Sequence, residues 1–355
     1  MRSDRGATAR PAAARFSPPA GSGDWERVAP AAVGWDEDRL AAALAFAGQK
    51  HSSGMVILHG GRIMAEEYWG GATAATRGDT ASVQKSMVSV LVGVAAHDGH
   101  LRLPAPVSEY LGRGWTKAPW EAEQRITVRH LLTMTAGLDE SLGYLSDAGT
   151  VWCYNTPAYQ MVKAVLAQAV NERIEEYTEQ RLLGPLGMCD SGWVPRKNQY
   201  MADGATLMTG MMTTPRDMAR FGLMVLNNGL WDGNDIVHDQ HYLRDALNPS
   251  QPLNPSYGYL WWLNGQAQTL DVPEGSRGYG GFGGVKRDGP LMPTAPADLV
   301  AALGHGDKKI YVVPSLDLVV TRFGEAADSP AGGALSRFDD ELWRRLMAAA
   351  PEAAR

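Results

Sequence analysis

Apolar residues recur along this chain at two spacings, one typical of helices and one typical of strands. The stretch Asp36–Gly48 repeats them at helical intervals, with Asp36 placed to cap the first turn and Gly48 to end the helix. Residues 54–70 hold two β-rich runs on either side of His59-Gly60-Gly61, which predicts a hairpin. Comparable signals predict helices from Thr127 to Ala136-Gly137, over Pro157–Val170, Met212–Asn228 and about Arg337–Ala350, and strands over Tyr257–Leu263, Leu299–Leu303, Ile310–Val313 and Asp317–Arg322.

This order of elements predicts how the domains are organised. Strands gather near both ends of the chain and helices lie between them, which favours one antiparallel sheet with an inserted, mostly helical lobe. The fold class is therefore α/β of the α+β kind. We expect residues 1–25 to be a disordered tail, 26–80 with 255–355 to form the sheet domain, and 81–254 to form the helical domain, with the active site between the two domains.

The tetrapeptide Ser82-Val83-Gln84-Lys85 is the strongest candidate for chemistry. Residues three apart share a helix face, so the Ser82 hydroxyl and the Lys85 amine can lie side by side. The helix that follows is apolar almost all round, which predicts that it is buried and that a charged lysine there is costly. A neutral amine can activate a serine nucleophile. The structural alternative is a helix-capping Ser82 and a Lys85 whose amine reaches water.

Composition and charge narrow the function classes. A net charge of −6 and a pI near 5.8 argue against a nucleic-acid partner, and no window has the apolar length of a membrane span. Cys153 and Cys189 imply no disulfide framework, and no secretory signal is visible in residues 1–25, so we expect a cytoplasmic protein. No cofactor motif occurs, and His238 and His241 fit a solvated loop better than a metal site. The expected partner is a small amide or ester substrate, and a homodimer is compatible with the sequence.

Five stretches resemble one known family. They are the hairpin ending EEYWGG, the SVQKS segment, HLLTMTAGL at 130–138, PLGM at 185–188 with TTPRDMARFG at 213–222, and YGYLWW at 257–262 with IYVVPSLDLVV at 310–320. Together they resemble the serine β-lactamase and DD-peptidase superfamily, on the class C-like branch that also holds family VIII carboxylesterases and 6-aminohexanoate-dimer (nylon oligomer) hydrolases. The resemblance implies the β-lactamase-like fold, with terminal helices beside the sheet, and a cofactor-free serine hydrolase that works through an acyl-enzyme.

The resemblance also implies a tyrosine between nucleophile and substrate. Tyr154-Asn155-Thr156 is the best match to the family's Tyr-x-Asn or Tyr-x-Ser, and Tyr144-Leu145-Ser146 is a rival of similar spelling. We expect Lys85 to favour the phenolate of Tyr154, which would then relay a proton to the leaving group. The predicted substrate pocket comprises Tyr144, Trp152, Asn155, Thr156, Trp261 and Asp307.

The family's third element departs from its usual form here. The sequence contains no Lys-Thr-Gly, and Gly304-His305-Gly306-Asp307 occupies the corresponding stretch. We expect His305 N–H, with Gly306 beside it, to complete an oxyanion hole with Ser82 N–H. The Gly-rich loop at residues 278–284 is the rival location. Because the carboxylate-binding lysine of β-lactamases is missing, the resemblance favours hydrolysis of small amides or esters, with a lean toward 6-aminohexanoate oligomers, over β-lactamase or DD-peptidase activity. The alternatives are a family VIII carboxylesterase acting on short-chain esters and, last, a non-catalytic binding protein that retains the scaffold.

Overall fold

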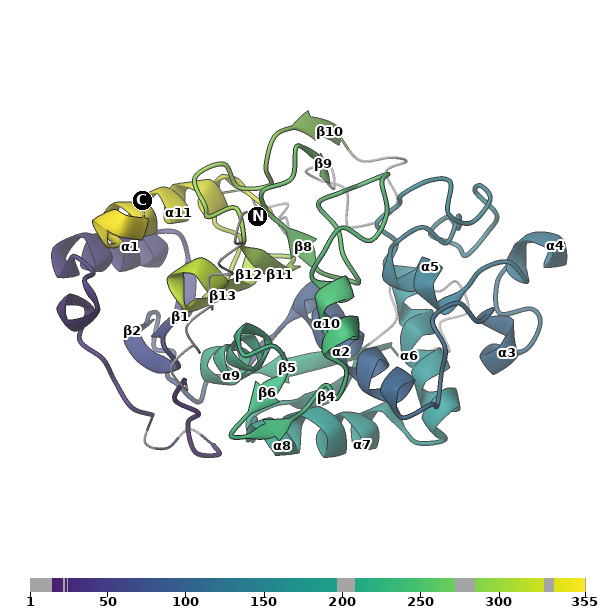
Figure 1. Cartoon of the computed structure of the whole chain (residues 1–355), viewed down its shortest axis with the longest axis horizontal. Helices are drawn as coiled ribbons and strands as arrows, with labels where there is room; N and C mark the ends of the chain where they lie inside the picture. Colours follow the sequence, from purple (N-terminus) through teal and green to yellow (C-terminus); the bar gives the residue numbers. More distant parts are fainter. Residues whose placement is uncertain are drawn as a thin grey trace, which may run out of the picture.

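A six-stranded antiparallel sheet forms the centre of one lobe of the protein, on the left in Figure 1. The computed structural model describes residues 15–21, 23, 25–196, 208–271, 285–328 and 335–354. The strand order is β2-β1-β13-β12-β11-β8, so the N-terminal hairpin pairs directly with the last strand of the chain. The strands are β1 (Ser52–His59), β2 (Arg62–Tyr68), β8 (Trp262–Leu263), β11 (Val300–Gly304), β12 (Lys308–Val313) and β13 (Leu318–Gly324). The expected α/β fold, with one antiparallel sheet built from both ends of the chain, is confirmed.

Helices cover both faces of this sheet. On one face, α11 (Arg337–Ala349) packs its Trp343 edge-on against Tyr311 of β12 and lies beside α1 (Glu37–Gln49). On the other face, α9 (Pro215–Leu226) places Gly222 against Ile310, the preceding residue of the same strand. Successive strand residues point to opposite faces, so the sheet is the middle layer of three.

The second lobe is mostly helical and is built around a buried helix. That helix, α2 (Gln84–His97), follows a short 3₁₀ turn at Ala81–Val83, and its residues 84–95 are all buried. It packs against α6 (Thr156–Val170). The other helices are α3 (Ser108–Leu111), α4 (Trp120–Glu123), α5 (Val128–Leu132), α7 (Ile174–Thr178), α8 (Gly184–Leu186) and α10 (Gln240–Ala246). Short strands are β3 (Gly78–Asp79), β4 (Gly192–Arg196), β5 (Met208–Thr213), β6 (Leu230–Trp231), β7 (Asn234–Asp235), β9 (Gln268–Asp271) and β10 (Val285–Asp288).

The predicted strand over residues 257–263 is wrong for most of its length. Only β8 forms a strand, because the segment turns back on itself at Leu260, which has a positive φ of 62°. Tyr259 N–H and Leu260 N–H donate instead to the carbonyls of Ala246 and Leu132. The helix expected to end at residues 136–137 is also shorter and ends at Leu132, and the helix expected from residue 212 begins at Pro215, after strand β5.

Part of the predicted N-terminal tail is packed against the body of the protein. Arg220 of α9 is buried, and its guanidinium donates to the carbonyls of Pro18, Pro19 and Gly21. Arg15 forms an ion pair with Asp317. The expectation of a mobile tail is therefore wrong for residues 15–21, because a buried cation needs acceptors and this segment supplies them. Residues 1–14 lie outside the described part of the chain.

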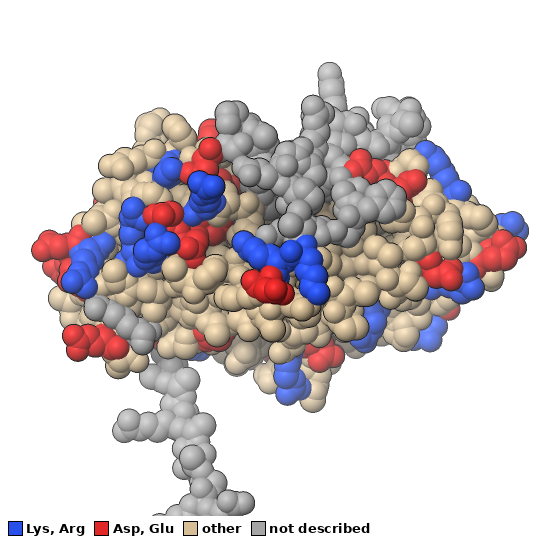
Figure 2. Space-filling model, turned by 90° about the horizontal axis from the view of Figure 1, so that it is seen from above, with Lys and Arg blue, Asp and Glu red and all other residues tan. Residues whose placement is uncertain are grey.

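The described surface carries charges of both signs. On the face shown in Figure 2, basic and acidic side chains lie beside one another in small groups. None of the helices in the described ranges is long and apolar enough to cross a membrane.

Candidate active site

Ser82 sits on a strained turn between β3 and α2. Ala81, the residue before it, has a positive φ of 48°, which is uncommon for a residue with a side chain. Two side chains hold this conformation: the Asp79 carboxylate accepts a hydrogen bond from Ala81 N–H at 2.7 Å, and Gln84 Nε2 donates to Ala81 O at 2.8 Å. Ser82 itself is half-buried. The turn therefore holds Ser82 in a defined conformation, with part of the residue exposed to solvent.

Lys85 lies directly behind this hydroxyl. Its Nζ is 2.8 Å from Ser82 Oγ, and its side chain is buried. Burial, with smaller contributions from the positive charges of Lys163 and Arg196, lowers the pKa of Lys85 to about 7. A substantial fraction of Lys85 is thus a neutral amine at neutral pH, and such an amine can accept the Ser82 proton. The solvated Lys85 of the structural alternative does not occur.

Tyr154 completes the group around Ser82. The Tyr154 ring centroid is 5.1 Å from Lys85 Nζ. Burial raises the pKa of Tyr154 to about 12, and the neighbouring Ser82 side chain offsets this only in part. The expected phenolate is therefore not favoured, since burial penalises the anion and Lys85 is itself only partly charged. A protonated phenol beside Ser82 can still donate a proton.

Aromatic rings form a wall beside Tyr154. Trp262 stacks on the Tyr154 ring at 5.9 Å, and Tyr257 meets it edge-on at 6.3 Å. The predicted pocket residue Trp152 belongs to this cluster, with its ring 6.4 Å from that of Tyr154. Tyr257 was not predicted as a site residue, although it lies in the same short segment as Trp262.

The other predicted pocket residues have different surroundings. Asn155 caps α6 by accepting from Ala158 N–H, and its amide donates to two loop carbonyls, so its polar atoms serve the local fold. Thr156 is the half-buried first residue of α6. Tyr144 is 49% exposed. Trp261 is fully buried and stacks on Phe221, which makes it a core residue and corrects its assignment to the pocket.

The stretch Gly304-His305-Gly306-Asp307, predicted to complete the oxyanion hole, begins beside Ser82. A Cβ atom on Gly304, the last residue of β11, would lie 2.5 Å from Thr80 O and 3.2 Å from Ser82 N, so only glycine fits there. β8 pairs with β11 only at residues 300 and 301, so the last residues of β11, up to Gly304, are not paired with β8. His305, the next residue, is exposed and Gly306 is buried. The backbone at Gly304 thus approaches the backbone N–H of the nucleophile.

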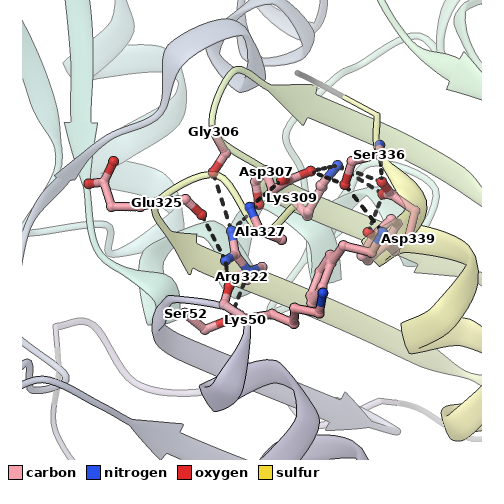
Figure 3. A network of polar contacts seen from close by, with 12 residues as sticks. Lys50, Ser52, Gly306, Asp307, Lys309, Arg322, Glu325, Ala327, Ser336 and Asp339 are labelled. Carbon is pink, nitrogen blue, oxygen red and sulfur yellow. Dashed lines mark hydrogen bonds and ion pairs between the residues drawn. The ribbon is translucent and has the colours of Figure 1, made fainter. Parts of the chain in front are cut away.

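The Asp307 carboxylate is buried in a polar network with Lys309, Ala327 and Ser336, which corrects its predicted place in the pocket (Figure 3). Its carboxylate accepts from Ala327 N–H at 2.8 Å and Ser336 Oγ at 2.9 Å and pairs with Lys309 at 3.0 Å. Burial alone would raise the pKa of Asp307, but Lys309 and these donors hold it below its ordinary value. Arg322 donates to the carbonyl of Asp307 at 2.8 Å. Asp307 therefore anchors the turn that follows β11.

Two residues near Lys85 were missed by the sequence reasoning. The ring centroid of Tyr159 lies 4.7 Å from Lys85 Nζ, and Lys163 is a second buried lysine close by. A signal for them exists, because residues 159, 162, 163 and 166 have the i, i+3, i+4, i+7 spacing of one helix face. A lysine within such an apolar stripe is a candidate for an unusual environment.

Within the described ranges, no group of His, Cys, Asp and Glu is arranged to hold a metal ion. His241 contacts Arg244, and the ring of His238 lies near that of His97. The rival third element at residues 278–284 lies outside the described residues.

Comparison with known families decides the class. A family model described as Beta-lactamase matches residues 37–306, which is most of the chain. This chain belongs to the beta-lactamase family. Members of this family are hydrolases, and the Ser82–Lys85 pair lies within the matched region.

Similar proteins agree with this assignment at the level of the fold. An uncharacterized protein of Alkalihalophilus pseudofirmus is 24% identical over 309 residues, covering 78% of this chain and 84% of its own length. The structure of a protein from Bacillus anthracis, provisionally assigned as a 6-aminohexanoate-dimer hydrolase, aligns with a TM-score of 0.64 at 16% identity, over 92% of this chain and 86% of its own. A beta-lactamase structure from Mycobacterium bovis gives a TM-score of 0.60 at 18% identity, over 86% of this chain and 97% of its own.

Proposed function

We propose that this member of the beta-lactamase family is a serine hydrolase that cleaves small amides or esters through an acyl-enzyme, with Ser82 as nucleophile and Lys85 as general base. One observation carries the proposal: the amine of a fully buried lysine lies 2.8 Å from the hydroxyl of a half-buried serine on a strained turn. The lowered pKa of Lys85 supports it, because the amine must be free to accept a proton.

The reaction follows from these positions. Ser82 Oγ attacks the substrate carbonyl carbon, and its proton moves to Lys85 Nζ. The oxygen that becomes negative is met by the backbone N–H groups of Ser82 and His305; the tight approach of Gly304 to Ser82 supports this second donor. As the bond to the leaving nitrogen or oxygen breaks, Tyr154 gives that atom its phenolic proton and regains one from Lys85. Water then attacks the acyl-enzyme and releases the acid and free Ser82.

Amides of the 6-aminohexanoate-oligomer type are the substrate class we favour. The sequence has no Lys-Thr-Gly, and with it lacks the lysine on that segment that binds the carboxylate of β-lactam substrates in the family it resembles. The buried rings of Trp152, Tyr257 and Trp262 pack around Tyr154 and give the site apolar surroundings, which suit a methylene chain better than a charged group. The fold likeness to the Bacillus anthracis protein agrees with this choice.

Labelling with a fluorophosphonate serine probe tests the mechanism. Intact-protein mass spectrometry should show one adduct on the wild-type protein and none on Ser82→Ala. Ser86→Ala is the matched control, since the Ser86 hydroxyl is buried and donates to Leu260 O at 2.7 Å; it should keep the adduct. A labelled Ser82→Ala variant would refute the assignment.

Turnover assays test the substrate class. Linear 6-aminohexanoate oligomers, short-chain p-nitrophenyl esters and a cephalosporin should be compared on the same preparation, with the amide oligomers giving the highest kcat/KM. Faster ester turnover without oligomer cleavage would instead indicate a carboxylesterase of the family VIII type, and rapid acylation by the cephalosporin would indicate β-lactam chemistry.

A further inference from the structure

A second buried lysine lies next to the proposed general base. Lys163 belongs to α6, is 6% exposed, and takes no part in the mechanism above. Its Nζ donates to Thr209 O at 2.8 Å and lies 3.2 Å from Thr209 Oγ1. The ring centroid of Trp193 lies 4.8 Å from the same nitrogen, within cation–π range. A lysine in a core has to be held by partners of this kind.

The two lysines share one aromatic ring. Lys85 Nζ lies 4.7 Å and Lys163 Nζ 5.8 Å from the centroid of Tyr159, so the two amines are no more than about 10.5 Å apart. The Tyr159 hydroxyl is buried and has no hydrogen-bond partner among the described residues. Burial raises the pKa of Tyr159 well above its ordinary value, so this ring provides no neutralising anion, and positive charges on the two lysines repel each other.

The surroundings of the two amines are unequal. Lys163 has two oxygen acceptors and an indole face, whereas the hydrogen bond seen for Lys85 is to the hydroxyl of Ser82. An ammonium ion is therefore better solvated at Lys163 than at Lys85. Among the described residues, the other charged groups acting on the pair are Arg196 of β4, which disfavours a proton on either lysine, and Glu175 of α7, which favours one on Lys163. Arg196 is in turn paired with Asp79.

We propose that Lys163 is a positioning residue for the general base: it holds the proton that this buried pair can accommodate, and its charge keeps the Lys85 amine free to receive the proton of Ser82. The proposal rests on the proposed function, because it assigns Lys163 a role only through Lys85. In this chain, which has no Lys-Thr-Gly, a cation on α6 would thus control the protonation of the general base.

The size of the effect follows from the geometry. At an effective dielectric constant of about 20, two unit charges roughly 10 Å apart change each other's pKa by about one unit. Burial, aided by Arg196 and opposed by Glu175, also lowers the pKa of Lys163 to about 7, so the pair titrates over the same pH range. Removing the charge of Lys163 should therefore let Lys85 keep its proton to higher pH.

The pH dependence of Ser82 acylation tests this role. The second-order rate constant for the fluorophosphonate probe should be measured from pH 5.5 to 9.5 on wild type, Lys163→Met, Lys163→Arg and the control Lys117→Met, which removes an exposed lysine. We expect the acidic limb of Lys163→Met to move up by about one pH unit, with roughly tenfold slower acylation at pH 6 and near wild-type acylation at pH 9. Lys163→Arg and Lys117→Met should keep the wild-type midpoint.

The outcomes separate the two proposals. A uniform loss of rate in Lys163→Met with an unchanged midpoint would mean a purely structural role and would overturn the inference. An upward shift in Lys163→Arg, which retains a positive charge, would overturn it as well, and this variant decides the matter if Lys163→Met does not fold. If wild-type Ser82 is not labelled at all, it is the proposed function that fails.

Discussion

Replacing Lys85 by methionine should abolish activity and, at neutral pH, make the protein more stable. Methionine has a similar length and no charge to bury. In the unfolded chain the pKa of Lys85 is near its ordinary value of 10.5, and in the folded protein burial, with Lys163 and Arg196, lowers it to about 7. Between these two values the unfolded state binds a proton that the folded state does not, so the lysine destabilises the fold there.

The magnitude follows from the difference in pKa. Each unit corresponds to about 1.4 kcal/mol, so the cost of Lys85 is roughly 5 kcal/mol when fully present below pH 7, and it disappears as the pH approaches 10.5. The gain in Lys85→Met should therefore shrink by about 1.4 kcal/mol per pH unit between pH 7.5 and 9.5. Differences in packing between the two side chains add an offset that does not depend on pH.

Urea unfolding at a series of pH values between 6.5 and 9.5 measures this directly. The difference in unfolding free energy between variant and wild type is plotted against pH, and only its slope is diagnostic. A flat difference, whatever its sign, would refute the reasoning, because it would show that Lys85 binds its proton equally in the folded and unfolded states.

Three further substitutions probe other parts of the site. Gly304→Ala should slow acylation of Ser82 by roughly ten- to a hundredfold, since the new Cβ collides with Thr80 O and displaces the end of β11; probe kinetics with circular dichroism as the folding control would show this. Lys309→Met should lower the unfolding free energy by about 3–5 kcal/mol, because it leaves the buried carboxylates of Asp307 and Asp339 without their cation; an effect below about 1 kcal/mol in urea unfolding would contradict the network. Asn155→Ala should cost about 1 kcal/mol from the lost cap and increase hydrogen exchange at residues 138–139, where unchanged exchange would argue against the anchoring role.

The sequence was most informative where local pattern and chemistry coincide. The apolar run after Lys85 predicted a buried helix, and burial is the main cause of the lowered lysine pKa. The capping residue Asp36 predicted the start of α1, because a cap depends only on neighbours a few positions away. The antiparallel sheet was predictable for a similar reason, since its long strands carry their own signal.

Directions of side chains at turns were not predictable. Asp307 follows a strand end beside the nucleophile, yet its φ of 57° and its ion pair with Lys309 turn the carboxylate toward α11. Trp261 and Trp262 are adjacent in sequence but face different surroundings, one against Phe221 and the other against Tyr154. Both outcomes depend on partners distant in the chain, which one-dimensional spacing does not reveal.

The pairing of β1 with β13 has a consequence for how the protein is made. Arg322 and Ser52, joined by a hydrogen bond between these strands, are separated by 270 positions in the chain. A ribosome that has released β1 and β2 must therefore synthesise the whole helical lobe before β13 emerges to cover the open edge of β1. Until then that edge offers unpaired backbone groups to other nascent chains. Expression at lower temperature or with added chaperones should consequently raise the yield of folded protein, although neither changes the stability of the finished fold.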